Sequence, residues 1–208
     1  IPFRGFLLEG PPGNGKTEIA KQAVRRLSLE LGEVFLRFVD SAEIARPRWG
    51  DAEKELRNIF RSSEECGKPC ILLFDDIDCL MIKRGSSIAR EWHYSIDALM
   101  FHELDKMNPS KVLVIATTNR PSLIDYALRS RLYAIKIPSL PLEELKEIAR
   151  YLLDSCWPTY GPFANDDSIK EDILNVILNS LKRRKHPSIR DVQHLLISEC
   201  IKRGVWAI

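Results

Sequence analysis

Residues 10–17 read Gly-Pro-Pro-Gly-Asn-Gly-Lys-Thr, a G-x-x-x-x-G-K-T pattern whose residue types suit the binding of phosphate. Glycines let the backbone curl until its N–H groups point at phosphate oxygens, and a helix that starts there adds its positive end. Lys16 can place a positive charge on the β- and γ-phosphates, and the Thr17 hydroxyl can ligate Mg²⁺. The residues that we expect to hold the phosphates are Gly10, Pro11, Pro12, Gly13, Asn14, Gly15, Lys16, Thr17 and Glu18.

The flanks of this pattern favour phosphate binding over a glycine- and proline-rich turn that happens to precede a lysine. A short apolar run at residues 6–8 is typical of a buried strand. Behind the pattern, apolar residues recur at helical spacing, at Ile19, Ala20, Ala23, Val24, Leu27 and Leu31. The pattern therefore lies where a strand ends and a helix begins.

Two aspartates follow the apolar run at residues 70–74. A run that is apolar at every position suits a strand covered on both faces, and paired carboxylates at its end are costly unless a cation is near. We interpret Asp75 as a magnesium-orienting group and Asp76 as the group that polarises an attacking water. The alternative is a solvated turn at the end of the strand.

Asn119 ends a further apolar strand, predicted over residues 112–119. Its amide could align a hydrolytic water between the phosphate and Asp76. The alternative is that Asn-Arg-Pro simply makes a turn.

Strands and helices alternate along the first two thirds of the chain, which predicts a parallel sheet with helices on both faces. Further strands are expected at residues 34–40 and 134–137, helices at 51–66, 88–107 and 122–128, and an irregular stretch at 41–50. After residue 141 the pattern changes to helices alone, at 142–156, 168–182 and 188–203. We therefore predict a nucleotide-binding subdomain over residues 1–138 and a helical subdomain over residues 139–208.

Composition places the chain among soluble globular proteins, with 45% apolar and 29% charged residues and a net charge of +2. The five cysteines include no C-x-x-C pair, which favours reduced thiols in an intracellular protein of the cytoplasm or nucleus. We expect no membrane segment and no signal peptide, and the early first strand suggests a module of a longer protein.

The motifs described above, and the order in which they occur along the chain, resemble those of the AAA/AAA+ ATPases. Residues 4–17 resemble the first strand and Walker A motif, residues 71–78 the Walker B motif, and residues 116–121 the sensor 1 motif. The resemblance implies an α/β fold of the P-loop NTPase class, an αβα sandwich with a five-stranded parallel sheet and a small C-terminal all-helical lid. It also implies ATP and Mg²⁺ as ligands and assembly into a ring, usually a hexamer.

Three arginines fall where the family carries functional arginines. Arg129 and Arg131 are implied to be arginine fingers, which reach the γ-phosphate on a neighbouring subunit. We favour Arg131, although the sequence between the two is shorter than usual and both could be surface arginines. Arg190 resembles a sensor 2 arginine that touches nucleotide, and the alternative is an exposed arginine at a helix start; Ser188 and Asp191 there resemble a capping box.

The chain departs from the family pattern at two places. Asp76 stands where a glutamate is usual, and because aspartate is one methylene shorter we expect slow hydrolysis. In the segment that resembles a pore loop, Arg48 takes the usual aromatic position and Trp49 the aliphatic one. Trp49 could grip a threaded polypeptide or pack on its own subunit, and Arg46 and Arg48 could contact an acidic partner or phosphate.

These observations predict an ATPase with four catalytic residues, Asp76, Asn119, Arg131 and Arg129, that forms a ring with like subunits and remodels polypeptide partners. Arg190 and the basic run at residues 182–186 keep open a DNA-associated loader or initiator as an alternative. Asp76 keeps open a weakly active nucleotide-dependent assembly switch.

Overall fold

The computed structural model describes residues 3–44, 51–81, 91–158 and 166–205. The chain forms two compact units. One unit comprises residues 1–11 and 16–137, and the other comprises residues 12–15 and 138–208. The first contains the sheet, and the second contains three helices.

The first unit is built on one parallel sheet of five strands, in the order β2-β3-β4-β1-β5. The strands are β1 (Gly5–Glu9), β2 (Phe35–Asp40), β3 (Cys70–Asp75), β4 (Val112–Thr118) and β5 (Tyr133–Lys136). The five-stranded parallel sheet and the α/β fold of a P-loop NTPase were predicted from the sequence and are confirmed.

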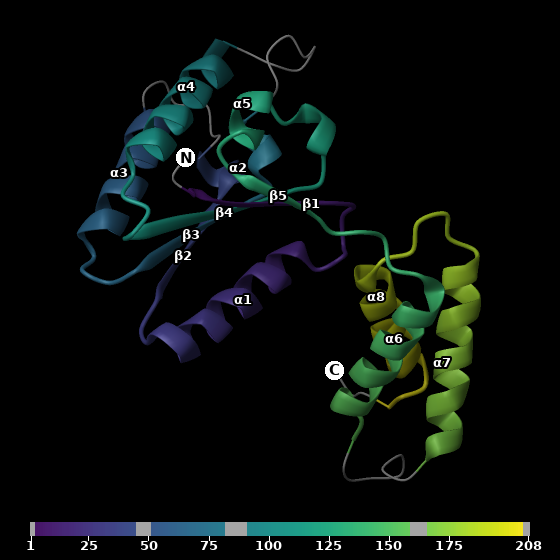
Figure 1. Cartoon of the computed structure of the whole chain (residues 1–208). Helices are drawn as coiled ribbons and strands as arrows, with labels where there is room; N and C mark the ends of the chain where they lie inside the picture. The colour runs from purple at the N-terminus through teal and green to yellow at the C-terminus, as the bar shows by residue number, and fades with distance from the viewer. Residues whose placement is uncertain (1–2, 45–50, 82–90, 159–165, 206–208) are drawn as a thin grey trace. The chain divides into compact units, whose positions relative to one another are not determined.

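Helices cover both faces of this sheet (Figure 1). α1 (Lys16–Leu31) lies on one face. On the other lie α2 (Ser41–Ile44), α3 (Asp51–Glu65), α4 (Glu91–Lys106) and α5 (Tyr126–Arg129). Two short 3₁₀ turns, η1 (Ile77–Cys79) and η2 (Pro121–Leu123), follow β3 and β4.

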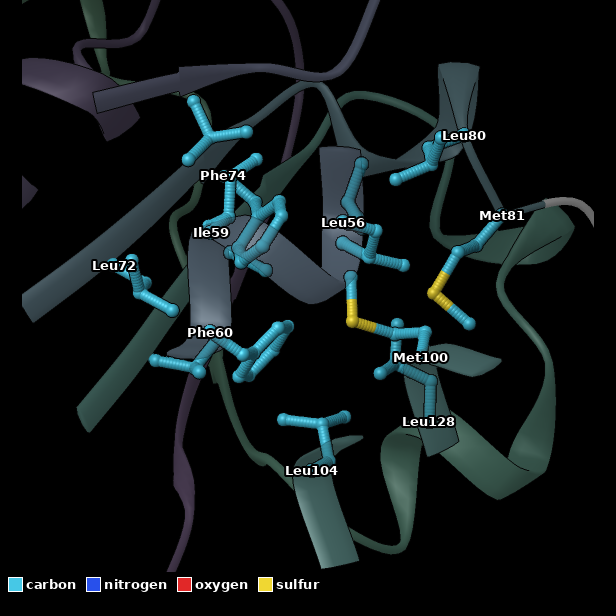
Figure 2. Packing of buried hydrophobic residues seen from close by; sticks show 14 of the residues in the cluster. Leu56, Ile59, Phe60, Leu72, Phe74, Leu80, Met81, Met100, Leu104 and Leu128 are labelled. Carbon is cyan, nitrogen blue, oxygen red and sulfur yellow. The ribbon is translucent and has the colours of Figure 1, made fainter. Parts of the chain in front are cut away.

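The two faces of β3 explain why its sequence is apolar throughout. Leu72 and Phe74 pack among side chains of α3 and α4 in the larger apolar core, which Figure 2 shows. Ile71 and Leu73 belong to a second core on the other face, together with Ala20 and further residues of α1. A strand that supplies both cores cannot alternate apolar and polar residues.

The register of the sheet brings the ends of three strands together. β1 and β4 pair so that Glu9 lies beside Thr118, and β3 pairs with β4 so that Phe74 lies beside Ala116. Because the strands are parallel, the residues that follow β1, β3 and β4 emerge at one edge of the sheet.

Two stretches differ from the sequence-based expectation. Residues 41–44 form the short helix α2 instead of the expected irregular segment, because the Asp40 carboxylate accepts a hydrogen bond from the Ala42 N–H at 2.9 Å and caps the turn. The helix expected at 122–128 is divided into η2 and α5, since Asp125 begins α5 as an N-cap and accepts from the Ala127 N–H.

The second unit contains α6 (Leu142–Cys156), α7 (Asp167–Lys182) and α8 (Ile189–Lys202), which pack around a shared apolar core. The side chains of Asp166 and Ser188 cap α7 and α8, and Ser188 forms the predicted capping box with Asp191. In the described part of residues 138–208 there is no strand, in agreement with the predicted helical character.

The five cysteines, all among the described residues, are thiols. Burial raises the pKa of Cys200 to about 11, so this thiol is protonated at neutral pH. Among the described residues no helix is long and apolar enough to cross a lipid bilayer.

Candidate nucleotide site

Lys16 begins α1 and is held at the base of the loop that precedes it. Its Nζ donates to the carbonyl oxygens of Gly10 and Pro11 at 3.0 and 2.8 Å. It also donates to Oδ1 of Asn119 at 2.6 Å, and the residue is only 5% exposed. A positive charge is thus held at the edge of the sheet where β1 and β4 end.

The loop requires glycine at two positions. Gly13 and Gly15 both have a φ of +78°, a left-handed conformation that residues with a Cβ rarely adopt. Within the second unit, the Gly13 carbonyl accepts a hydrogen bond from the Arg190 N–H at 3.2 Å. Asn14 is buried there and donates from Nδ2 to the carbonyl of Pro138 at 3.1 Å.

Asp75 receives two hydroxyl groups on a single carboxylate oxygen. Thr17 donates from Oγ1 to Oδ1 of Asp75 at 2.6 Å, and Thr117 donates to the same oxygen at 2.7 Å. Thr17 and Asp75, the two residues that we expect to bind or orient Mg²⁺, are therefore in direct contact.

This donor set suits magnesium. A hydroxyl and a carboxylate are hard oxygen donors, and Mg²⁺ in proteins is commonly held by one or two such groups together with substrate phosphates. The described residues contain no cluster of three or more His, Cys, Asp or Glu that could hold a metal ion. By donor type alone, the hydroxyl of Thr17 and the carboxylate of Asp75 fit a magnesium ion that also binds phosphate oxygens.

Asp76 has a left-handed backbone, with φ 48° and ψ 54°, the one such residue besides glycine in the described chain. For an aspartate this conformation costs about 1 kcal/mol. The Asp76 N–H donates to Oγ1 of Thr117 at 3.0 Å, and Oδ1 of Asp76 accepts from Nδ2 of Asn119 at 2.7 Å. Both bonds attach Asp76 to the end of β4.

Asn119 links the phosphate loop to the second aspartate, because its amide oxygen accepts from Lys16 while its amide nitrogen donates to Asp76. The Asn119 backbone is itself held by Asp78, which is 8% exposed. Oδ1 of Asp78 accepts from Oγ1 of Thr118 at 2.6 Å and from the Asn119 N–H at 3.3 Å.

Sequence reasoning missed Thr117, Thr118 and Asp78 as residues of this site. The available signal was two consecutive hydroxyl residues immediately before Asn119, and a third carboxylate two positions after Asp76. Which oxygen each hydroxyl reaches depends on the register of β3 against β4, which the local sequence does not specify.

Arg129, one of the two expected arginine fingers, contacts its own subunit. It forms an ion pair from NH2 to Oε2 of Glu9 at 2.7 Å and donates to the carbonyl of Pro121 at 2.8 Å. Glu9 is the last residue of β1, directly before the phosphate loop. The pair thus joins α5 to the strand that leads into the loop.

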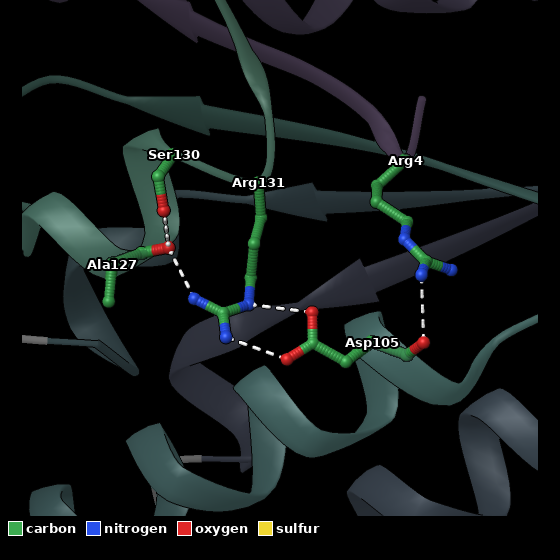
Figure 3. A network of polar contacts seen from close by, with 5 residues as sticks. All are labelled: Arg4, Asp105, Ala127, Ser130 and Arg131. Atoms are coloured by element: carbon green, nitrogen blue, oxygen red, sulfur yellow. Dashed lines mark hydrogen bonds and ion pairs between the residues drawn. The ribbon is translucent and has the colours of Figure 1, made fainter. Parts of the chain in front are cut away.

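Arg131, the favoured finger, also has partners in its own chain (Figure 3). Its Nε and NH2 donate to the two carboxylate oxygens of Asp105 at 2.9 and 2.6 Å, and NH1 donates to the carbonyl of Ala127 at 2.9 Å. The guanidinium lies 4.9 Å from the ring centre of Phe101. Hydrogen bonds from Arg131 lower the pKa of Asp105 below its usual value.

Two further predicted residues, Glu18 and Arg190, are exposed. Glu18 is exposed in the first turn of α1 and accepts from Nε2 of Gln22 at 2.6 Å. The Arg190 side chain is exposed at the start of α8. The predicted pore-loop residues Arg46, Arg48 and Trp49 lie outside the described residues.

A family model described as "ATPase family associated with various cellular activities (AAA)" matches residues 6–138. Among curated proteins, an "AAA ATPase forming ring-shaped complexes" of Corynebacterium kroppenstedtii is 34% identical over 200 residues, covering 91% of this chain and 35% of that protein.

Two relatives from other organisms match a shorter part. The "Ribosome biogenesis ATPase RIX7" of Saccharomyces cerevisiae is 36% identical over 133 residues, covering 62% of this chain and 15% of its own length. A "Cell division cycle protein 48 homolog" of Archaeoglobus fulgidus is 38% identical over 128 residues, covering 61% of this chain and 17% of its own length. The chain thus spans about a third or less of these curated relatives.

Proposed function

Because the chain belongs to the AAA family of ATPases, we propose that it is the ATP-binding and ATP-hydrolysing module of a ring-forming protein that remodels protein partners. One observation carries the proposal. A continuous set of contacts joins Lys16 through Asn119 to Asp76, beside the Thr17–Asp75 pair. Charge for phosphate, oxygens for a metal and a carboxylate for water thus lie at one edge of the sheet.

The loop and Lys16 bind the triphosphate of ATP. The two left-handed glycines turn backbone N–H groups toward phosphate oxygens, and the start of α1 adds the positive end of its dipole. In the structure Nζ of Lys16 contacts neutral oxygens of Gly10, Pro11 and Asn119. A phosphate competes well for this ammonium because a charge-assisted hydrogen bond is stronger than one to a neutral oxygen.

Thr17 and Asp75 would hold Mg²⁺, which when bound neutralises charge on the β- and γ-phosphates. Asp76 accepts a proton from the attacking water, and Asn119 orients that water from the other side. Aspartate reaches the water less well than glutamate, so hydrolysis by this module is slow.

Arg131 supplies positive charge to the γ-phosphate bound on a neighbouring subunit. For this role its side chain must leave Asp105, and the exposure of the pair makes the exchange inexpensive. The Arg131 and Asp105 side chains are 26% and 53% exposed, and exposed ion pairs contribute about 1 kcal/mol or less.

The relatives named as forming ring-shaped complexes support assembly into a ring, and we propose six subunits with a polypeptide as the substrate. A DNA-associated loader is the second candidate. Its support is a run of five exposed basic side chains, residues 182–186, that starts at the last residue of α7 and continues toward α8. Within this run Arg184 is paired with Asp191 of α8.

Steady-state ATPase assays test the proposal. Wild-type protein should hydrolyse ATP in the presence of Mg²⁺, and Lys16→Ala should abolish nucleotide binding and hydrolysis together. An unfolded polypeptide should stimulate the rate, whereas stimulation by DNA alone would favour the loader. Wild-type protein that neither binds nor hydrolyses ATP would contradict both candidates.

A further inference from the structure

The hydroxyl of Thr117 lies between the two aspartates of the site. Oγ1 donates to Oδ1 of Asp75 at 2.7 Å and accepts the N–H of Asp76 at 3.0 Å. The residue is 1% exposed, so water does not offer a ready substitute for either partner.

The directions of these two bonds are set by chemistry. A threonine hydroxyl has one proton and two lone pairs. A backbone N–H can only donate, so a lone pair of the Thr117 hydroxyl accepts the hydrogen bond from the Asp76 N–H. The single hydroxyl proton is then donated to the Asp75 carboxylate. One side chain therefore orients the carboxylate of Asp75 and the backbone of Asp76 at the same time.

We propose that Thr117 is a positioning residue for hydrolysis, an inference that rests on the proposed ATPase function. For Asp75, the bond from Thr117 is separate from the bond that Thr17 makes to the same oxygen. When Thr17 turns to a metal ion, Thr117 still holds the carboxylate in place.

For Asp76, the hydroxyl secures a backbone conformation that the side chain depends on. The residue is left-handed at φ 48°, and its carboxylate reaches Nδ2 of Asn119 at 2.7 Å. Because the aspartate side chain is short, the position of its Cα largely determines where the carboxylate lies. Thr117 and Asn119 together attach the backbone and side chain of Asp76 to the end of β4.

The test compares Thr117→Val, which keeps the branched shape but removes the hydroxyl, with Thr117→Ser, which keeps the hydroxyl. We expect Thr117→Val to lower kcat by about tenfold to a hundredfold, the usual loss when a residue supporting a metal ligand is removed. Thr117→Ser, in contrast, should retain most of the rate.

Two readouts do not depend on turnover. The affinity of Thr117→Val for a fluorescent ATP analogue should fall when Mg²⁺ is present and match wild type in EDTA. The backbone N–H of Asp76 should exchange with deuterium faster than in wild type. Ser63→Ala is the matched control, because it removes another buried hydroxyl. The Ser63 hydroxyl donates to the carbonyl of Ile59 at 2.7 Å, and both residues lie in α3, outside the site.

The inference is overturned if Thr117→Val keeps wild-type kcat and magnesium dependence, or if Thr117→Ser is as impaired as Thr117→Val. It is also overturned if Ser63→Ala causes the same loss. Thr117→Ala provides a second variant should valine prevent folding. If wild-type protein shows no ATPase activity, both the proposed function and this inference are contradicted. If wild type is active and Thr117→Val hydrolyses ATP at the same rate, only this inference is contradicted.

Discussion

Asp76 illustrates how a single residue sets the rate expected of the site. Its side chain is one methylene shorter than glutamate, and its left-handed backbone is attached to β4 through Thr117 and Asn119. The carboxylate is therefore held at the end of β4, and under the proposed function it would reach less far than a glutamate toward a water near the phosphate.

Asp76→Glu should raise kcat, by about tenfold, because a positioned general base contributes about 10²–10⁴-fold and only part of that is lost through short reach. Steady-state ATPase rates at saturating ATP measure the change. Asp76→Asn is the control, since it keeps the size but removes the charge, and it should be nearly inactive while still binding nucleotide. An unchanged or lower rate in Asp76→Glu would contradict the explanation.

Asp105 gives a second prediction, about stability and pH. Hydrogen bonds from Arg131 lower its pKa in the folded protein, so the carboxylate contributes stability above its unfolded pKa of about 3.9 and loses it as pH falls through the lower folded pKa. Asp105→Asn should thus lower the free energy of unfolding at pH 7, and with it the Tm. The loss should be no more than about 1 kcal/mol because the pair is half-exposed.

The difference in Tm between wild type and Asp105→Asn should shrink as the pH falls below about 4. Thermal unfolding followed by circular dichroism from pH 7 to pH 3 measures it. Glu171→Gln is the comparison, because it removes an acid from the exposed ion pair with Arg150 on the helical unit. A difference that grows toward acid pH would be opposite in sign to this prediction.

At the scale of elements, side chains at the ends of helices form hydrogen bonds with backbone groups that the helix leaves unpaired. Arg4 donates to the carbonyls of Asp105 and Met107 at 2.8 and 2.7 Å and so satisfies the negative C-terminal end of α4. α8 begins with a capping box, in which Ser188 and Asp191 each accept a backbone N–H of the other.

Ser188→Ala should destabilise the helical unit by about 1 kcal/mol, the usual effect of removing an N-cap. Loss of helical circular dichroism on heating measures this. Ser155→Ala is the matched control, because Ser155 is an exposed serine in α6 that donates only to the carbonyl of Tyr151. Equal Tm values for the two variants would show that the box does not stabilise α8.

At the scale of the whole molecule, the role proposed for Arg131, which lies two residues after α5, makes activity depend on assembly. Arg131 is bound to Asp105 and Ala127 of its own chain, while the proposed function requires it on a neighbour. Specific activity should therefore rise with protein concentration as rings assemble.

Mixing two inactive variants tests this most sharply. Lys16→Ala loses the nucleotide but keeps Arg131, and Arg131→Ala keeps the nucleotide but loses the arginine. A mixture should be more active than either variant alone, because a ring can place an intact arginine beside an intact nucleotide site. Asp105→Ala is the control for the lost contact, since it breaks the same pair and leaves Arg131 in place. If the mixture stays as inactive as its parts, Arg131 does not act between subunits.

The sequence alone was sufficient for the parallel sheet, and it predicted that the glycine-rich loop and the two aspartates follow strands of that sheet. These features depend on local residue types, such as glycines that permit a φ of +78° and an apolar run covered on both faces. Element boundaries were close, and the exceptions at α2 and α5 arose from aspartate caps at Asp40 and Asp125.

Only the tertiary structure decided what these residues touch. That Asn119 joins Lys16 to Asp76, and that Thr117 serves Asp75 and Asp76 together, follows from β4 lying between β1 and β3 in a particular register. The contact of Arg131 with Asp105 spans 26 residues of sequence. Such pairings depend on strand order and packing between distant segments, which no local pattern of residues encodes.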